Sequence, residues 1–144
     1  MKRLTLLRHG HAIAETPAGA GDAERVLSAA GLAEARDAGR RFAARFGSCD
    51  LMLVSAAART RQTADAAMTG GLQAKVTCTD RRLYLATPAE LLEVVREQAD
   101  GCEHVLLVGH NPGLSELAAR LARDPGFPGL GTAEWRSFEL DAIP

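Results

Sequence analysis

The sequence predicts an α/β protein, built as a three-layer sandwich with a mostly parallel central sheet and helices on both faces. Three observations point to this fold class. Short apolar runs of strand length alternate with longer segments of helical periodicity. The 144 residues suit one domain, spanning 1–144, and 47% of them are hydrophobic, which is enough for a single core. Strands that alternate with helices form parallel sheets covered on both faces.

The first half of the chain contains four predicted elements and one long loop. Residues 2–8 include the apolar run Leu-Thr-Leu-Leu and predict a strand. Residues 12–24 are rich in Ala, Gly, Glu and Asp and predict a loop. From 28 to 47, apolar residues recur at helical spacing and a glycine stands at the expected end. Residues 50–55 are typical of a buried strand, and residues 58–68 predict a helix before two glycines.

The second half continues the alternation. Residues 75–79 predict a short strand. Residues 87–98 predict a helix, because Thr-Pro-Ala-Glu at its start supplies a capping hydroxyl, a proline at the first position and a glutamate three after the cap. Residues 104–109 form another apolar run and predict a buried strand. A helix is expected from 111 to 122, and a last strand from 135 to 140.

Composition excludes several classes of protein. The net charge is −1 and no long run carries one sign, which argues against nucleic acid or a membrane surface as a partner. Cys49, Cys78 and Cys102 are odd in number and widely spaced, so reduced thiols are expected rather than disulfides or zinc. The first apolar run is too short for a signal peptide or a membrane span. A cytoplasmic location is therefore expected.

Three of the predicted strands end in residues that can bind or attack a phosphoryl group. Because the carboxyl ends of parallel strands meet at one edge of a sheet, these residues should converge there. An arginine fork binds phosphoryl oxygens, a neutral imidazole can attack phosphorus, and a helix N-terminus favours an anion. The residues are Arg8-His9-Gly10-His11 after the first strand, Ser55 and Arg59 after the second, and His110-Asn111 after the strand at 104–109.

These residues stand in four short blocks that resemble the signature of the histidine phosphatase superfamily. One block is similar to the Arg-Pro-Leu-Ser/Thr segment of the short SixA-type phosphohistidine phosphatases, with Val26 in place of the proline. The blocks follow one another between residues 4 and about 118, which is nearly the whole chain. The resemblance implies the phosphoglycerate-mutase-like fold. The blocks are Leu7-Arg8-His9-Gly10, Arg25-Val26-Leu27-Ser28 with Gly31, Val54-Ser55 with Arg59 and Gln62-Thr63, and Val108-Gly109-His110-Asn111-Pro112.

The resemblance also implies roles for individual residues. His9 is the expected nucleophile, which becomes transiently phosphorylated. Arg8, Arg59 and His110 are expected to bind and polarise the phosphoryl oxygens, and this agrees with the chemistry of the residues themselves. The residues expected to contribute to substrate binding are Gly10, His11, Arg25, Ser55 and Asn111.

No metal and no other cofactor is expected. The pair His9-x-His11 has a spacing that could bind a metal ion. However, the adjacent Arg8 would repel a cation, and the nearby carboxylates are limited to Glu15, Asp22 and Glu24. Phosphoryl chemistry without a metal is therefore the preferred interpretation.

The substrate prediction rests on a missing acid. Relatives that cleave phosphate esters carry a carboxylic acid that protonates the leaving oxygen, in some directly after the second histidine, where this chain has Asn111. In others the acid lies between the second and third blocks, where the comparable stretch 82–86 has none. Asp80 and Glu90 are the remaining candidates. The imidazole of a phosphohistidine needs such a proton less.

The sequence therefore predicts a phosphatase that hydrolyses phosphohistidine on a protein, such as a phosphotransfer domain of a bacterial signalling pathway. The short chain leaves no room for a long lid, and an open site suits a side chain displayed on another protein. One alternative is a small-molecule phosphomonoesterase acting on a sugar or nucleotide phosphate. Another is a catalytically weak module that binds phosphohistidine.

Overall fold

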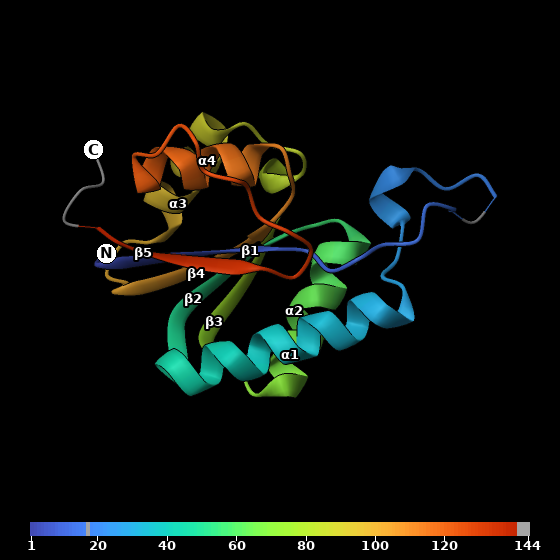
Figure 1. The fold of residues 1–144 in the computed structure, drawn as a ribbon, viewed down its shortest axis with the longest axis horizontal. Coiled ribbons are helices and arrows are strands. Elements are labelled where there is room, and N and C mark those ends of the chain that lie inside the picture. The colour runs from blue at the N-terminus through green and yellow to red at the C-terminus, as the bar shows by residue number, and fades with distance from the viewer. Residues whose placement is uncertain (17, 141–144) are drawn as a thin grey trace.

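A five-stranded sheet with strand order β3-β2-β4-β1-β5 forms the centre of the computed structural model, which describes residues 1–16 and 18–140 (Figure 1). Helices α1 and α2 cover one face, and α3 and α4 cover the other. This arrangement confirms the predicted three-layer α/β fold. The strands are β1 (Arg3–Arg8), β2 (Ser48–Ser55), β3 (Gln73–Asp80), β4 (His104–Gly109) and β5 (Trp135–Glu139). The helices are α1 (Ala29–Phe46), α2 (Ala58–Gly70), α3 (Pro88–Gln98) and α4 (Gly113–Ala122), with 3-10 turns η1 (Asp22–Glu24) and η2 (Arg81–Leu83).

The sheet is parallel except at one edge. Strand β4 pairs in parallel with β1 and β2, and β2 pairs in parallel with β3. Strand β5 pairs with β1 in the antiparallel direction. The central strands are buried on both faces, which explains their continuous apolar runs. The sheet is thus mostly parallel, as predicted.

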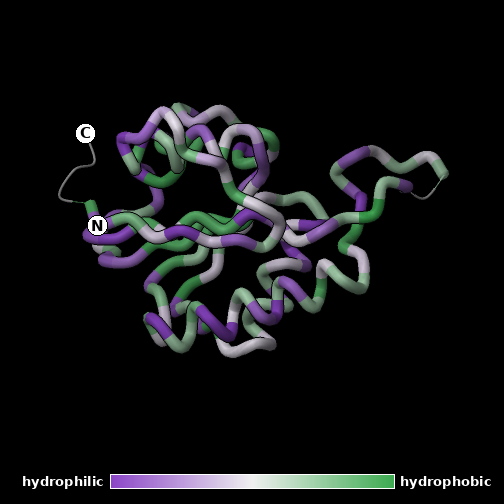
Figure 2. The backbone as a smooth tube through the Cα atoms, viewed as in Figure 1, coloured by the Kyte–Doolittle hydropathy of each residue, from purple (hydrophilic) through white to green (hydrophobic). Residues whose placement is uncertain are grey.

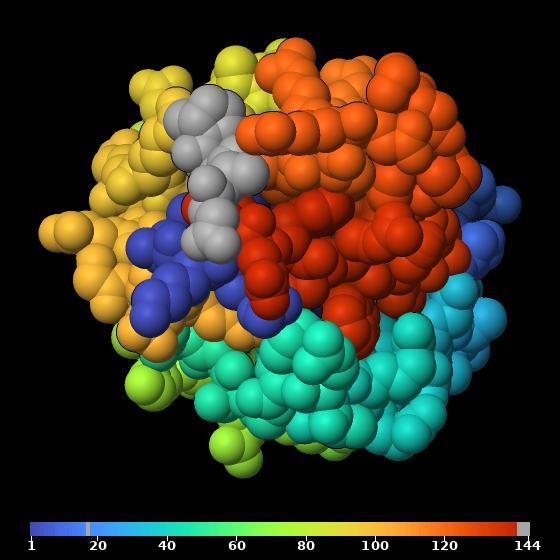
Figure 3. Space-filling model, turned by 60° about the vertical axis from the view of Figure 1, so that its left-hand side comes forward, coloured from blue at the N-terminus to red at the C-terminus, as the bar shows by residue number. Residues whose placement is uncertain are grey.

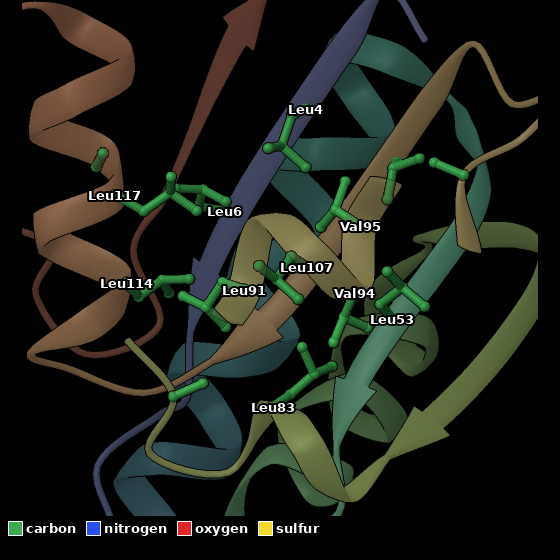
Figure 4. Close-up of a cluster of buried hydrophobic side chains, with 14 of the residues drawn as sticks. Leu4, Leu6, Leu53, Leu83, Leu91, Val94, Val95, Leu107, Leu114 and Leu117 are labelled. Carbon is green, nitrogen blue, oxygen red and sulfur yellow. The ribbon is translucent and has the colours of Figure 1, made fainter. Parts of the chain in front are cut away.

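The larger core cluster lies between the sheet and the α3–α4 layer (Figure 4). Leu6 and Leu107 face each other across β1 and β4, and Leu53 continues the layer from β2. Leu91 of α3 and Leu114 of α4 close it from above. A second cluster, around Phe42 and Met52, packs under the α1–α2 layer. Figure 2 shows the same division, with hydrophobic residues concentrated in the sheet.

Local signals set the helix boundaries. The Ser28 hydroxyl accepts a hydrogen bond from Gly31 N at the start of α1, and Gly47 ends this helix with a φ of 76°. Thr87 and Glu90 form a capping box at the start of α3. These ends were predicted. Strand β3 is longer than the predicted 75–79, because parallel pairing with β2 extends through its polar ends.

The segment after β1 leaves the body of the molecule. Residues 12–16 and 18–26, here called the arm, extend beyond the carboxyl ends of the strands (Figure 1). Ile13 N donates to Val26 O at 2.9 Å, and an isolated bridge joins Ala12 to Leu27, so the base of the arm is closed. The arm was predicted as loop, and it contains the 3-10 turn η1.

The two ends of the described chain meet on the side away from the arm. Leu140 N donates to Lys2 O at 2.9 Å. Figure 3 shows this side, where β5 (red) lies between α4 (orange) and α1 (cyan) with the N-terminal residues beside it. Within residues 1–16 and 18–140, no helix has the length and apolarity needed to span a bilayer.

Candidate active site

His9 lies directly after β1, at the edge of the sheet where the strands end. Its backbone is fixed on both sides, because His9 N donates to Gly109 O at 3.2 Å and Ala133 N donates to His9 O at 3.0 Å. The register that pairs Arg8 with Gly109 places the next residues, His9 and His110, side by side. Their ring centroids are 5.4 Å apart. The parallel pairing of β1 and β4 therefore brings the two predicted histidines together.

The environment of His9 fixes its tautomer and its charge. Nδ1 lies 2.7 Å from Gly10 O, and because a carbonyl oxygen only accepts, Nδ1 carries the proton. The lone pair is therefore on Nε2. Burial, with a smaller contribution from the positive charges of Arg59 and Arg8, lowers the pKa of His9 to about 4. At neutral pH the side chain is a neutral imidazole with a free Nε2, which is the form that can attack phosphorus.

His110 is buried and is held by one partner. Its Nε2 lies 2.7 Å from Ser55 Oγ, at the end of β2. Burial, and next the charge of Arg59, lower its pKa to about 3, so this ring is also neutral. Its Nδ1 is buried and makes no hydrogen bond to any described residue. When Ser55 donates to Nε2, Nδ1 carries the proton and is a donor.

Arg8 ends β1 and is anchored by the loop before β5. Its Nη1 donates to Leu130 O at 3.1 Å. Its Nε is buried and has no hydrogen-bond partner among the described residues. The same Leu130 carbonyl accepts from Asn111 Nδ2 at 3.0 Å. Arg8 Nε is therefore the second buried polar atom in this region without a partner among the described residues, after His110 Nδ1.

Arg59 enters the site from the first turn of α2, and only 4% of its side chain is exposed. Its guanidinium donates twice to Asp22, through Nη1 to the backbone oxygen at 2.9 Å and through Nη2 to Oδ2 at 3.0 Å. Thr63, also on α2, links this helix to the loop after β1, because its hydroxyl accepts a hydrogen bond from Gly10 N and donates one to Arg59 O. The position of Arg59 is thus coupled to that of His9.

Asp22, in η1 of the arm, is the site residue that the sequence did not single out for the phosphoryl centre. Its carboxylate accepts from Arg59, from Arg25 at 3.0 Å, and from the Tyr84 hydroxyl. The bonds from Tyr84 and Arg25 hold the pKa of Asp22 well below its usual range, so it is ionised. A signal was available, since Asp22 stands three residues before Arg25, the spacing of one turn.

The structure also places the other predicted substrate-binding residues. Gly10 lies so close to α1 that an added Cβ would be 2.6 Å from Gly31 O. His11 is exposed, and its Nδ1 lies 2.9 Å from Ser28 Oγ. Asn111 accepts from both the backbone and the hydroxyl of Ser115, so its carboxamide holds the start of α4. Of the five predicted binders, Ser55 and Arg25 contact the site residues through their side chains.

Asp80 and Glu90, the two remaining candidates for a general acid, both form hydrogen bonds with nearby residues. Asp80 accepts from Arg82 N and from its guanidinium. Glu90 is committed to the capping box of α3. In the described part of the chain, no three His, Cys, Asp or Glu residues form a group that could hold a metal ion.

A cavity of about 390 Å³ opens beside the contact between Asp22 and Tyr84. The Tyr84 ring forms one wall, and it meets the His110 ring edge-on with centroids 5.4 Å apart. The cavity therefore adjoins the histidines through a single aromatic ring. Its lining residues are Ala23, Glu24, Ala56, Ala57, Arg61, Arg81 and Tyr84.

The family model of the histidine phosphatase superfamily (branch 1) matches residues 4–81. The chain belongs to this superfamily. It is also 37% identical to the uncharacterized protein Rv1276c of Mycobacterium tuberculosis. This match extends over 116 residues and covers 81% of this chain and 71% of that protein. The predicted family is thereby confirmed, and the members of this superfamily are phosphatases.

Solved structures support the same assignment. A protein described as the phosphohistidine phosphatase SixA of Agrobacterium tumefaciens is 30% identical, with a TM-score of 0.81 over 94% of this chain and 90% of that chain. A mycobacterial glucosyl-3-phosphoglycerate phosphatase, Rv2419c, is 21% identical, with a TM-score of 0.67 over 95% and 90% of the two chains. The second likeness is one of fold.

Proposed function

We propose that this protein is a phosphohistidine phosphatase that acts on a phosphorylated protein of the cytoplasm through a covalent phospho-His9 intermediate. One observation carries the proposal. Two buried polar atoms, Arg8 Nε and His110 Nδ1, have no partner among the described residues. Both belong to neighbours of His9, because the His110 ring centroid lies 5.4 Å from that of His9 and the charge of Arg8 helps to lower the pKa of His9. Buried polar groups are normally hydrogen-bonded. Oxygens of a bound phosphoryl group would satisfy both.

The proposed reaction has two displacements. The phosphoryl oxygens accept hydrogen bonds from Arg8, from Arg59 and from Nδ1 of His110, which balance the charge that develops in the transition state. Nε2 of His9 attacks phosphorus, the bond to the leaving nitrogen breaks, and phospho-His9 forms. Water then attacks phospho-His9 in line and releases phosphate. The Gly10 carbonyl retains the Nδ1 proton of His9 throughout.

Two features favour a protein phosphohistidine as substrate. The stretch 82–86, which is comparable to the segment that supplies an acid in some ester-cleaving relatives, contains no carboxylate, and its Tyr84 hydroxyl donates to Asp22. The chain is also similar to a SixA protein, with 30% identity and a TM-score of 0.81, against 21% and 0.67 for the glucosyl-3-phosphoglycerate phosphatase. A phosphotransfer domain of a signalling pathway is the kind of partner that fits. His11 and Arg25, which lie at the base of the arm, are proposed to contact it.

The test is to follow the phosphoryl group. Protein carrying labelled phosphohistidine is mixed with the wild-type chain and with His9→Ala, and both label transfer and phosphate release are measured. The wild type should become labelled and turn over, whereas His9→Ala should lose turnover by about 10⁴-fold or more. His104→Asn is the matched control, because this histidine lies at the start of β4, away from the candidate site, and contacts Thr5 and the Phe42 ring. Label retained on His9→Ala would contradict the assignment of the nucleophile.

A small-molecule phosphomonoesterase is the second candidate, and the cavity beside Tyr84 favours it. Arg61 and Arg81 line a space that could take an anionic sugar or nucleotide moiety. Phosphate esters of graded leaving-group acidity separate the two functions. Without a general acid, alkyl esters should react far more slowly than aryl esters. A flat series would favour the esterase, and binding of phosphohistidine without any phosphoenzyme would indicate the weak binding module.

A further inference from the structure

One acidic side chain contacts a phosphoryl-binding arginine of the proposed site. Asp22 reaches Arg59 from the arm, although the two residues are 37 positions apart in the chain. It also accepts a hydrogen bond from the hydroxyl of Tyr84, which lies in the stretch 82–86 that lacks an acid. The arm thus adds a carboxylate to the proposed site, whereas the candidate residues that follow β1, β2 and β4 include no carboxylate.

The Asp22 carboxylate retains accepting capacity and is accessible. An ionised carboxylate has about four lone-pair positions, and its three side-chain donors, Arg25, Arg59 and Tyr84, use three of them. Oδ1 receives only the bond from Arg25. The side chain is 44% exposed, in contrast to 4% for Arg59. A further donor can therefore reach Oδ1 from the solvent side.

The leaving group of a phosphohistidine has a specific requirement. When the P–N bond breaks, its electron pair passes to the leaving nitrogen. If the other ring nitrogen already carries a proton, the imidazole departs neutral and needs no acid. His9 of the proposed site meets the same requirement, because the Gly10 carbonyl holds a proton on its Nδ1 while its Nε2 binds and releases the phosphoryl group.

We propose that Asp22 makes the equivalent contact to the substrate: its Oδ1 accepts the N–H of the distal nitrogen of the substrate's phosphohistidine. The carboxylate thereby favours the protonated ring, whose P–N bond is ready to break, and gives no assistance to an alkoxide. Asp22 is a specificity-determining residue for phosphoramidates of imidazole. This inference rests on the proposed function and adds a selection of the leaving group to it.

The groups that face Asp22 come from three elements. Arg25 lies on the arm itself, Arg59 on α2, and Tyr84 after η2. Glu24, Arg61 and Arg81 line the adjoining cavity. The bound phosphoryl dianion balances Arg8 and Arg59. The charge of Asp22 is then balanced mainly by Arg25, and the Tyr84 hydroxyl and the incoming N–H are its polar partners.

The experiment compares Asp22→Asn with the wild type on two substrates. Asparagine has the same shape and keeps an oxygen for Arg59, but it loses the charge. One substrate is a phosphohistidine peptide, and the other is an aryl phosphate whose acidic phenol leaves without a proton. Rates are measured across the pH range. Glu15→Gln, which removes one carboxylate from an exposed position of the same arm, is the control.

We expect Asp22→Asn to lose about tenfold in kcat/KM on the peptide near neutral pH, with the alkaline limb of its profile shifted about one pH unit lower. The kcat/KM of Asp22→Asn on the aryl phosphate should stay within about threefold of the wild type. Glu15→Gln should leave kcat/KM unchanged on both substrates.

Two results would overturn the inference. An equal loss on both substrates would mean that Asp22 only positions Arg59. An unchanged peptide rate and profile would mean that it makes no contact with the leaving group. A wild-type chain that hydrolyses the aryl ester but not the peptide would refute the proposed function itself, and this result does not depend on the variant.

Discussion

A single arginine side chain shows how closely the proposed chemistry depends on residue type. Arg59 is almost fully buried and presents a planar fork whose two terminal nitrogens are both engaged by Asp22. A lysine ammonium is a compact point charge and cannot hold two such bonds in a plane. The shape of this residue therefore matters as much as its charge.

Arg59→Lys should accordingly behave almost like a deletion. Loss of a preorganised donor costs about 2.7–4 kcal/mol of transition-state stabilisation, or roughly 10²–10³ in kcat. The measurement is steady-state hydrolysis of an aryl phosphate, with Arg36→Lys, an exposed position on α1, as the control. A wild-type rate for Arg59→Lys would show that the fork has no catalytic function.

At this scale the sequence predicted which residues after the strands would lie together, and it did not predict that Asp22 of the arm would join them. His9, Arg8 and His110 could be found because a parallel sheet brings strand ends together. Asp22 lies in a segment without apolar periodicity, and its partner Tyr84 is 62 positions away. The spacing of Asp22 and Arg25 is a local signal, but nothing in the local sequence indicates the contact between Asp22 and Tyr84, because that contact depends on how the arm folds back.

Among the helices, α1 and α2 pack with little space between their backbones. A Cβ built on Gly39 of α1 would collide with the backbone oxygen of Ala67 in α2. A Cβ on Gly70 of α2 would likewise collide with the backbone oxygen of Arg36 in α1, so the absence of side chains at these two positions allows the helices to approach. Arg59 lies on α2, so this contact also supports the proposed site.

Gly39→Ala tests the packing through the sign of its effect. In an open helix the substitution would gain about 1 kcal/mol through helix propensity. Here overpacking should outweigh that gain, because inserted atoms in a packed interface cost about 1–3 kcal/mol. Urea denaturation gives the free energy of unfolding. A more stable variant would show that the helices separate without cost.

The elements themselves were largely predictable, for reasons that differ from one to the next. The capping box at Thr87 and the glycine at 47 are local signals, so the ends of α3 and α1 were found. The turns η1 and η2 span three residues each and have no periodicity to detect. The direction of β5 depends on the loop 123–134, which returns from the end of α4 to the edge where β1 and β4 end, so that β5 runs antiparallel to β1.

Across the whole molecule, three of the four histidines titrate far below their ordinary range. Burial is the main cause in each case, and it lowers the pKa to about 4 for His9 and His104 and to about 3 for His110. His9 and His110 lie in the candidate site, whereas His104 contacts Thr5 and the Phe42 ring at the start of β4. The folded protein thus keeps neutral rings in two separate places.

Stability should therefore fall as the pH is lowered from about 6.5 towards 4. In this window the unfolded chain binds protons at these three histidines and the folded chain does not, so acid favours unfolding. Denaturant midpoints at pH 7.5 and pH 5 measure the effect. His104→Asn removes one of the three groups and should flatten the dependence without touching the candidate site. A midpoint independent of pH would contradict the burial of these rings as neutral groups.

The meeting of residues 2 and 140 at the far end of the sheet has a practical consequence for binding measurements. Attaching the protein to a sensor surface through either end of this chain orients the arm and the strand ends towards the solution. The proposed phosphorylated partner can then be tested for binding at His9 without steric interference from the support. Immobilisation through lysines would be less uniform, because Lys2 lies at this end and Lys75 lies on the exposed edge strand β3.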